Sequence, residues 1–251
     1  MGLFKNAHDS HRHSLDVLNM IYDYDSFLDG IGTVADVGCG IGLDTEWWAT
    51  LHTRDDPPEH REIAVYAMDL NIDQIEPHIL EENPKVIPRL GNFEIDILPS
   101  KVDLVWSHDS LQYAYDPLGC LRNWRKMLNT NGMLVLTVAQ TTYLHNNRLV
   151  VENYSHQYYS YNILNLMYML AIAGFDCRDA YFYRKENTPW LYAGVYASEH
   201  ESLPENPTWY DLAERNLIND SIIRSVNSCG YARLQDVVVA WFDKNLYQIT
   251  S

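Results

Sequence analysis

The stretch Ala35-Asp-Val-Gly-Cys-Gly-Ile-Gly42 places three glycines at alternating positions and continues the apolar run Gly32-Thr-Val-Ala35. A glycine-rich turn after a strand lets a ligand approach the backbone closely. A dinucleotide-binding turn has its third glycine one residue further along, where this chain has Leu43. The carboxylate of Asp36 would be badly placed beside a pyrophosphate and well placed beside a cationic group. The stretch therefore favours a small zwitterionic nucleoside over a dinucleotide as the ligand.

Apolar residues recur with strand-like and helix-like spacing in alternation along most of the chain. We predict helices at residues 14–27, 43–51, 72–82, 118–128 and 161–173, and strands at residues 33–37, 63–69, 86–90, 102–107, 132–138, 175–184 and 190–198. Pro77 is expected to shorten the third helix. The last two strands have only a short link, which suits antiparallel pairing, whereas the alternation elsewhere favours a mostly parallel α/β sheet.

Composition and charge narrow the class of protein. The chain has 251 residues, of which 47% are hydrophobic and 12% aromatic, as expected for a folded globular protein. Its formal net charge of -16 would repel nucleic-acid phosphates and anionic lipids, so we expect neither nucleic-acid nor membrane binding. The chain shows no signal-peptide pattern, and its four cysteines form no C-x-x-C pair. We therefore expect a cytoplasmic protein without a metal site.

The motifs resemble those of class I S-adenosylmethionine-dependent methyltransferases, which belong to the Rossmann-like methyltransferase superfamily. In that family an acidic residue and alternating glycines follow the first strand, as in residues 36–42 here. A second acidic residue ends the second strand and holds the ribose hydroxyls, and Asp69 stands at that position. The cofactor-binding residues that these two motifs imply are Asp36, Gly38, Cys39, Gly40, Asp69 and Leu70. The alternatives are a purely structural glycine turn and a capping role for Asp69.

The later motifs match the family less completely. The third reads Gly91-Asn92-Phe93 where the family has Gly-Asp-Ala, which implies that Asn92 meets the adenine amino group and Phe93 packs on the adenine ring. The fourth follows the fourth predicted strand and places Ser107 and His108 where family members contact cofactor and substrate. The fifth, residues 126–132, lacks the family's Pro-Gly-Gly but keeps an Asn-Gly turn.

His108 is the candidate catalytic base, because the resemblance places its loop beside the transferred methyl group. The alternative is a histidine that only shapes the pocket. Many methyltransferases need no strong base, since the sulfonium makes the methyl group electrophilic and positioning does most of the work. A base is needed mainly when the acceptor is a hydroxyl, an ammonium or an acidic carbon.

Residues 140–161 are rich in tyrosine and histidine and lie between the fifth predicted strand and the next helix. Small-molecule members of the family often insert a substrate-covering segment at this point. The candidate substrate contacts are Tyr143 and His145 in this segment, together with Tyr113. Clustered tyrosines suit an aromatic or cation-binding pocket, and ordinary amphipathic packing is the alternative.

The resemblance covers residues 15–198 and implies a three-layer sandwich around a seven-stranded, mostly parallel sheet with an antiparallel last strand. We expect residues 1–200 to form the methyltransferase domain with an N-terminal helical lid. Residues 201–251 are a C-terminal extension, which we expect to pack on the same domain; a substrate cover and a homodimer contact are the alternatives. The spacing of His8, His11 and His13 matches no metal site, so we expect a mobile terminus there.

The resemblance implies methyl transfer from S-adenosylmethionine to an oxygen, nitrogen or carbon atom of a small molecule, with S-adenosylhomocysteine as product. Three alternatives stay open: methylation of a protein, transfer of a group other than methyl, and a non-catalytic protein that kept the fold.

Overall fold

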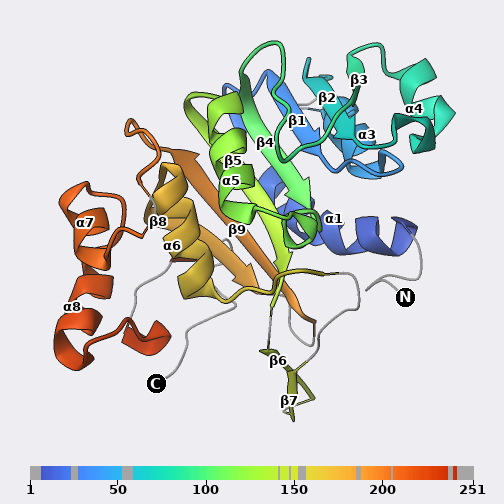
Figure 1. Cartoon of the computed structure of the whole chain (residues 1–251). Helices are drawn as coiled ribbons and strands as arrows, with labels where there is room; N and C mark the ends of the chain where they lie inside the picture. The colour runs from blue at the N-terminus through green and yellow to red at the C-terminus, as the bar shows by residue number, and fades with distance from the viewer. Residues whose placement is uncertain are drawn as a thin grey trace.

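A single mixed sheet forms the centre of the computed structural model (Figure 1). The structure describes residues 7–23, 28–52, 59–140, 142–146, 148–151, 157–184, 188–204, 206–236 and 240–241. The sheet order is β10-β8-β9-β5-β4-β1-β2-β3. The strands are β1 Thr33–Val37, β2 Ala64–Asp69, β3 Val86–Leu90, β4 Val102–His108, β5 Leu128–Ala139, β8 Phe175–Arg184, β9 Trp190–Ala197 and β10 Ala240–Trp241.

All neighbouring strands pair in parallel, except that β9 runs antiparallel to both β5 and β8. This arrangement confirms the predicted seven-stranded sheet with an antiparallel last strand. The two-residue strand β10 pairs with β8 at the sheet edge and adds a short eighth strand that we did not predict.

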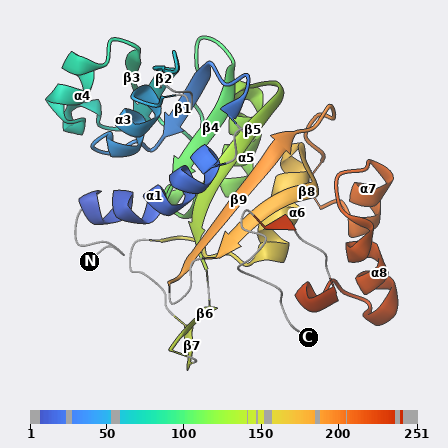
Figure 2. The same cartoon turned by 180° about the vertical axis from the view of Figure 1, so that it is seen from behind.

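Helices cover both faces of the sheet and complete three layers (Figures 1 and 2). The first face carries α1 Ala7–Asp23, α3 Leu43–Ala49 and α4 Pro77–Glu82, and the second carries α5 Pro117–Met127 and α6 Ile163–Ala173. Short 3-10 helices, η1 Ile72–Gln74 and η2 Leu111–Tyr113, follow β2 and β4. Within the described ranges, no helix has the length and hydrophobicity needed to cross a membrane.

Strand β9 shows how the sheet separates two hydrophobic cores. Trp190 and Tyr192 belong to the cluster under α1 and α3, whereas Leu191 and Ala193 belong to the cluster under α5 and α6. Successive side chains of a strand point to opposite faces, so one strand contributes to both cores. Trp48 of α3 is fully buried in the first core, as expected for one member of the Trp47-Trp48 pair.

Two predicted segments differ from the structure. Helix α1 begins at Ala7, so the segment that holds His11 and His13 is helical and not the mobile terminus that we expected. The reason is a set of contacts with α3, described below, that the sequence pattern does not reveal. Pro77 splits the predicted helix at residues 72–82 into η1 and α4, because proline cannot continue a helix but fits its first turn.

The insertion after β5 contains a hairpin and a return segment. Strands β6 Thr142–His145 and β7 Arg148–Val151 pair as the hairpin, which extends from the edge where β5 ends (Figure 1). Residues 157–161 then return to the sheet. The amides of Tyr158 and Tyr159 donate to the Gln112 carbonyl at 2.9 and 3.3 Å. The return segment is therefore attached to η2, and the Tyr161 amide joins it to the Ala139 carbonyl at the end of β5.

The C-terminal extension packs along α6 and β8. It contains α7 Trp209–Glu214, α8 Asp220–Cys229 and η3 Leu234–Asp236. Leu212 and Ile222 are fully buried in the core under α6. The amide of Cys177 in β8 donates to the Leu217 carbonyl at 2.8 Å, which fixes the extension to the sheet edge.

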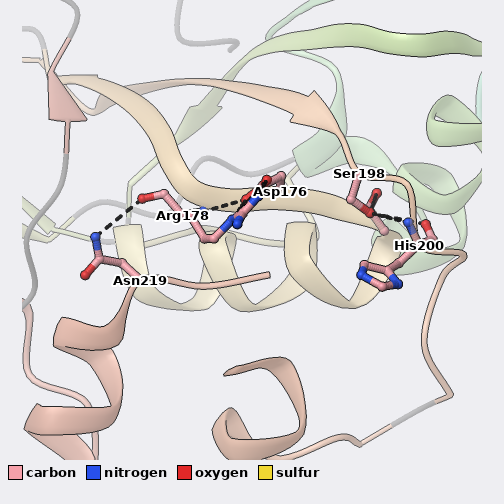
Figure 3. A network of polar contacts seen from close by, with 6 residues as sticks. Asp176, Arg178, Ser198, His200 and Asn219 are labelled. Carbon is pink, nitrogen blue, oxygen red and sulfur yellow. Dashed lines mark hydrogen bonds and ion pairs between the residues drawn. The ribbon is translucent and has the colours of Figure 1, made fainter. Parts of the chain in front are cut away.

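Polar contacts accompany this packing (Figure 3). Asn219 donates to the Arg178 carbonyl at 3.5 Å, and the Arg178 side chain pairs with Asp176 on the same strand. The Ser198 hydroxyl accepts the backbone amide of His200 at 3.1 Å. This serine donates to backbone carbonyls, as a turn residue does, and forms no nucleophile–base pair with the histidine ring.

Asp103 gives a stability prediction, because its carboxylate joins the starts of three strands. It accepts hydrogen bonds from the Gly32 amide, from the amide and hydroxyl of Thr33 and from the Asn129 side chain, all between 2.8 and 3.0 Å. We expect Asp103→Asn to lower the free energy of unfolding by about 1–3 kcal/mol at pH 7, measured by urea denaturation.

The same loss should depend on pH. Burial alone would raise the pKa of Asp103, but these hydrogen bonds hold it below its usual value. The stabilisation is therefore complete above the unfolded-state pKa of about 3.9 and is lost as the pH falls through the lower folded-state pKa. The exposed Asp29→Asn is the control. A difference between Asp103→Asn and the native chain that persists undiminished in strong acid would contradict this account.

Candidate cofactor site

The carboxyl ends of β1, β2 and β4 meet at one edge of the sheet, where the glycine turn predicted from the sequence lies. The amides of Gly38 and Cys39 donate to the Met68 carbonyl at 2.8 and 3.2 Å, and the Gly40 amide donates to Asp69 Oδ2 at 3.0 Å. The other Asp69 oxygen accepts the Asn71 amide at 3.0 Å. Asp69 therefore caps the turn after β2 and also fixes the turn after β1.

This double role still allows the predicted hydrogen bonds between Asp69 and ribose hydroxyls. Each carboxylate oxygen of Asp69 carries two lone pairs and accepts one backbone amide. The side chain is partly exposed at the same edge, so each oxygen retains an acceptor position for a hydroxyl. Leu70, which we predicted beside the ribose, is 65% exposed.

Asp36 is the buried acid of the site. Its carboxyl is 2% exposed and accepts a hydrogen bond from the Thr45 hydroxyl at 2.5 Å. Burial, followed by the charge of Asp44, raises the pKa of Asp36 well above its usual value. A buried carboxyl in this situation gains most from a cationic partner, because a positive charge restores its ionised form.

A cavity of about 90 Å³ lies against Asp36. Most sites for drug-sized ligands measure roughly 300–1,000 Å³, so this cavity encloses only one end of a nucleoside ligand. It is lined by His11, Asp36, Gly38, Cys39, Gly40, Ile41, Leu43, Asp44 and His108. The structure thus brings together four of the predicted cofactor residues and the predicted base. Ser107 is fully buried in β4 and is not part of this lining.

The glycine positions fit a ligand that approaches the backbone. A Cβ atom on Gly40, where φ is +56°, would meet no atom within 4 Å and would enter the cavity. A Cβ atom on Gly38, where φ is +79°, would lie 2.1 Å from the Ser110 hydroxyl oxygen. Gly38 therefore permits close packing against the loop after β4, and Gly40 keeps space free for the ligand.

Asp44 lines the cavity together with the glycine turn, although no sequence motif singled it out. It accepts hydrogen bonds from His11 Nδ1 at 2.5 Å, the Ser14 hydroxyl at 2.6 Å and the Trp106 indole at 2.9 Å. Burial alone would raise the pKa of Asp44, but the contacts with His11 and Ser14 and nearby histidine charges hold it below its usual value. Asp44 thus accepts from three side chains of the protein, whereas Asp36 accepts from Thr45, and the contacts of Asp44 attach α1 to the cavity.

His108 lies on the inner side of the cavity among aromatic rings. Its ring centroid is 6.4 Å from that of Trp106, 6.1 Å from that of Trp190 and 6.3 Å from that of Tyr192. Burial lowers the pKa of His108 to about 4. The imidazole is therefore neutral at physiological pH.

The predicted adenine contacts lie on the loop after β3. The Asn92 side-chain oxygen accepts the Glu94 amide at 2.9 Å, so this oxygen already closes its own turn. The Phe93 carbonyl accepts the Trp124 indole at 3.0 Å, and its ring edge faces the Gly38 turn. This position is compatible with stacking on a base beside the glycine turn.

The predicted substrate residues are placed only in part. Tyr113 lies on η2 and is partly buried. Tyr143 and His145 lie in β6, and their side chains fall outside the part of the chain that the structure describes. Their role in substrate binding stays a prediction.

Comparisons with known proteins agree with this geometry. Residues 35–134 match the sequence model of a methyltransferase domain family. Magnesium protoporphyrin IX methyltransferase from Synechocystis PCC 6803, crystallised with S-adenosylhomocysteine, superimposes with a TM-score of 0.55 at 14% identity, over 75% of this chain and 84% of that one. A search of curated proteins gave no match.

Two further structures give a similar agreement. A TehB-like S-adenosylmethionine-dependent methyltransferase from Corynebacterium glutamicum has a TM-score of 0.50 at 14% identity and covers 77% of this chain and 100% of that one. The 1,6-didemethyltoxoflavin-N1-methyltransferase from Burkholderia thailandensis has a TM-score of 0.50 at 16% identity and covers 76% and 84%. At identities this low, the structural similarity shows a shared fold.

The two glycines should respond differently to the same substitution. Both Gly38→Ala and Gly40→Ala incur roughly 1–2 kcal/mol of backbone strain, because both residues have a positive φ. Gly38→Ala should lose roughly 1–3 kcal/mol more free energy of unfolding through the clash with Ser110. Gly40→Ala should fold and bind S-adenosylhomocysteine more weakly, since its methyl group enters the cavity. Equal unfolding free energies, or full affinity in Gly40→Ala, would contradict these positions.

Proposed function

We propose that this chain, whose residues 35–134 match the model of a methyltransferase domain family, transfers the methyl group of S-adenosylmethionine to a small-molecule acceptor. The observation that carries the proposal is the buried carboxyl of Asp36 against a small cavity beside the glycine turn. S-Adenosylmethionine supplies an electrophilic methyl group on a positively charged sulfur. The chain's own residues bind this donor, orient it and exclude water.

The donor-side roles follow from the geometry of the cavity. Burial disfavours the ionised form of Asp36, and a nearby cation would stabilise it. The ammonium group on the methionine part of S-adenosylmethionine supplies that cation. Gly40 leaves room for that part, and the free lone pairs of Asp69 suit the ribose hydroxyls. The ring of Phe93 lies beside the Gly38 turn, and we assign it to the adenine ring.

A small-molecule acceptor is supported by charge and by the covering segment. The net charge of -16 opposes binding to nucleic-acid phosphates. The return segment at residues 157–161 is hydrogen-bonded to η2, which follows β4. Two proteins of similar fold carry names that state small-molecule acceptors, a porphyrin and a toxoflavin precursor.

Of the two roles considered for His108, we favour the one in which it shapes the pocket. Its ring is packed among Trp106, Trp190 and Tyr192, on the donor side of the loop. A base with a pKa of about 4 takes protons poorly from an acceptor at neutral pH. We therefore expect His108→Gln to change donor affinity more than the pH dependence of turnover.

Calorimetric titration with S-adenosylmethionine and S-adenosylhomocysteine tests donor binding. Asp36→Asn should weaken both ligands by about tenfold to a hundredfold, because both carry the amino-acid part and a charge-assisted hydrogen bond is worth roughly 1.5–3 kcal/mol. Asp73→Asn changes an exposed carboxylate on η1 and is the matched control. Absence of binding to either ligand by the native chain would overturn the proposal.

A panel of small molecules and unfolded peptides then separates the alternatives. Release of S-adenosylhomocysteine with a small molecule supports the proposed function. Release with peptides alone would favour a protein acceptor, and donor binding without release over a broad panel would favour a non-catalytic protein.

A further inference from the structure

The loop after β4 contains a carboxyl group that the motif comparison did not single out. Asp109 has a φ of +59°, in the left-handed region. Among the described residues, the other non-glycine residues with positive φ are all asparagines: Asn131, Asn146, Asn206 and Asn216. Asparagine and aspartate both tolerate this conformation, so the backbone alone would accept either residue at position 109.

The neighbours of Asp109 in the chain place it at the cavity mouth. His108 lines the cavity, and the Ser110 hydroxyl lies 3.2 Å from the Val37 carbonyl, against the Gly38 turn. The backbone of Asp109 therefore passes between the donor cavity and the solvent side of the loop. Its side chain turns away from the cavity lining, toward Gln112 and Tyr113 of η2.

The Gln112 side chain can form a hydrogen bond with either the ionised or the protonated carboxyl group of Asp109. Its side-chain amide nitrogen donates to Asp109 Oδ1. The Gln112 side chain is fully buried, and its Oε1 has no hydrogen-bond partner in the described part of the chain. If the amide turns over, Oε1 accepts from a protonated Asp109, so the residue is satisfied whether Asp109 is ionised or neutral.

The return segment at residues 157–161 is attached to Gln112, the same residue that contacts Asp109. The Gln112 carbonyl accepts the amides of Tyr158 and Tyr159. Asp109 thus follows His108, which lines the donor cavity, and contacts Gln112, which holds the covering segment. Among the described titratable groups, Tyr113 is the one whose pKa responds to Asp109: burial and then this charge raise it.

We propose that Asp109 is the general base of the reaction and that the acceptor atom therefore carries a proton, as a hydroxyl or an ammonium group does. This inference rests on the proposed methyltransferase function. The acceptor atom forms a bond to the methyl carbon while the carbon–sulfur bond breaks and leaves its electron pair on sulfur. The proton of the acceptor passes to the Asp109 carboxylate, during methyl transfer for a hydroxyl and before it for an ammonium group, whose nitrogen has no lone pair until it is deprotonated. From Asp109 the proton passes to water.

The ionisation of Asp109 agrees with this role. Burial raises its pKa to about 8. Its carboxylate is thus a far stronger base than His108, whose pKa is about 4. At pH 7 the free protein holds Asp109 mostly protonated, and a positive charge nearby would drive the proton off.

The test compares two ligands that differ by one charge. S-Adenosylmethionine has a sulfonium, whereas S-adenosylhomocysteine has a neutral thioether, and both have the same ammonium group beside Asp36. Calorimetry at pH 7 in buffers of different ionisation enthalpy measures the protons released on binding. We expect S-adenosylmethionine to release on the order of half a proton more than S-adenosylhomocysteine in the native protein.

The excess should disappear in Asp109→Asn, because asparagine keeps the side-chain size and tolerates the backbone conformation. The excess should persist in the control Asp73→Asn. Equal proton release by the two ligands in the native protein, or an excess that survives in Asp109→Asn, would overturn the inference but leave the proposed function intact. Failure of the native protein to bind either ligand would overturn the proposed function itself.

Turnover with an acceptor found in the panel gives a second measurement. Asp109→Asn should lower kcat by about 100-fold or more while the KM for S-adenosylmethionine changes little, and the fall of the rate at low pH should vanish. Unchanged kcat in Asp109→Asn, or an acceptor atom without a proton, would also overturn the inference.

Discussion

The close approach of Gly38 and Ser110 is the constraint on which the site depends. Strands β1 and β4 are neighbours in the sheet, with Asp36 opposite Trp106, so the turns that follow them meet at its carboxyl edge. They meet so closely that no side chain fits at Gly38. This contact fixes the donor cavity on one side and the loop that carries His108 and Asp109 on the other. The distance between donor and reaction loop is thereby set by backbone packing and not by flexible side chains.

Three carboxyl groups share this edge, and their hydrogen-bond partners separate their roles. Asp44 has three side-chain donors and Asp69 has two backbone amides, so both are held by the protein. Asp36 accepts a hydrogen bond from the Thr45 hydroxyl, and burial raises its pKa well above the usual value. In a chain that is already strongly acidic, this concentration of negative charge is stable only because two of the three groups are paired internally. The third is left for a ligand.

The sequence was sufficient to predict the sheet and the positions of the glycine turn and of the acidic strand ends. Alternating glycines and acidic strand ends depend on local backbone geometry, and local geometry is what a motif records. The cavity wall formed by Asp44 could not be predicted in this way, because its donors come from Ser14, 30 residues earlier, and Trp106, 62 residues later. Asp109 was missed for a different reason: its left-handed backbone and its contact with Gln112 appear only once the loop has folded. Helix α1 was predicted too short since contacts with α3, and not apolar spacing alone, determine where it begins.

The return segment after β5 is attached to η2 by main-chain amides of Tyr158 and Tyr159 that meet the Gln112 carbonyl. Main-chain contacts do not depend on which side chains the segment carries. The side chains of the segment can therefore be exchanged without moving η2 or the loop before it. Such an attachment allows descendants of one ancestor to diverge in the compounds they accept while the donor half stays constant, and it marks residues 157–161 as the place to begin when redirecting the enzyme toward a chosen compound.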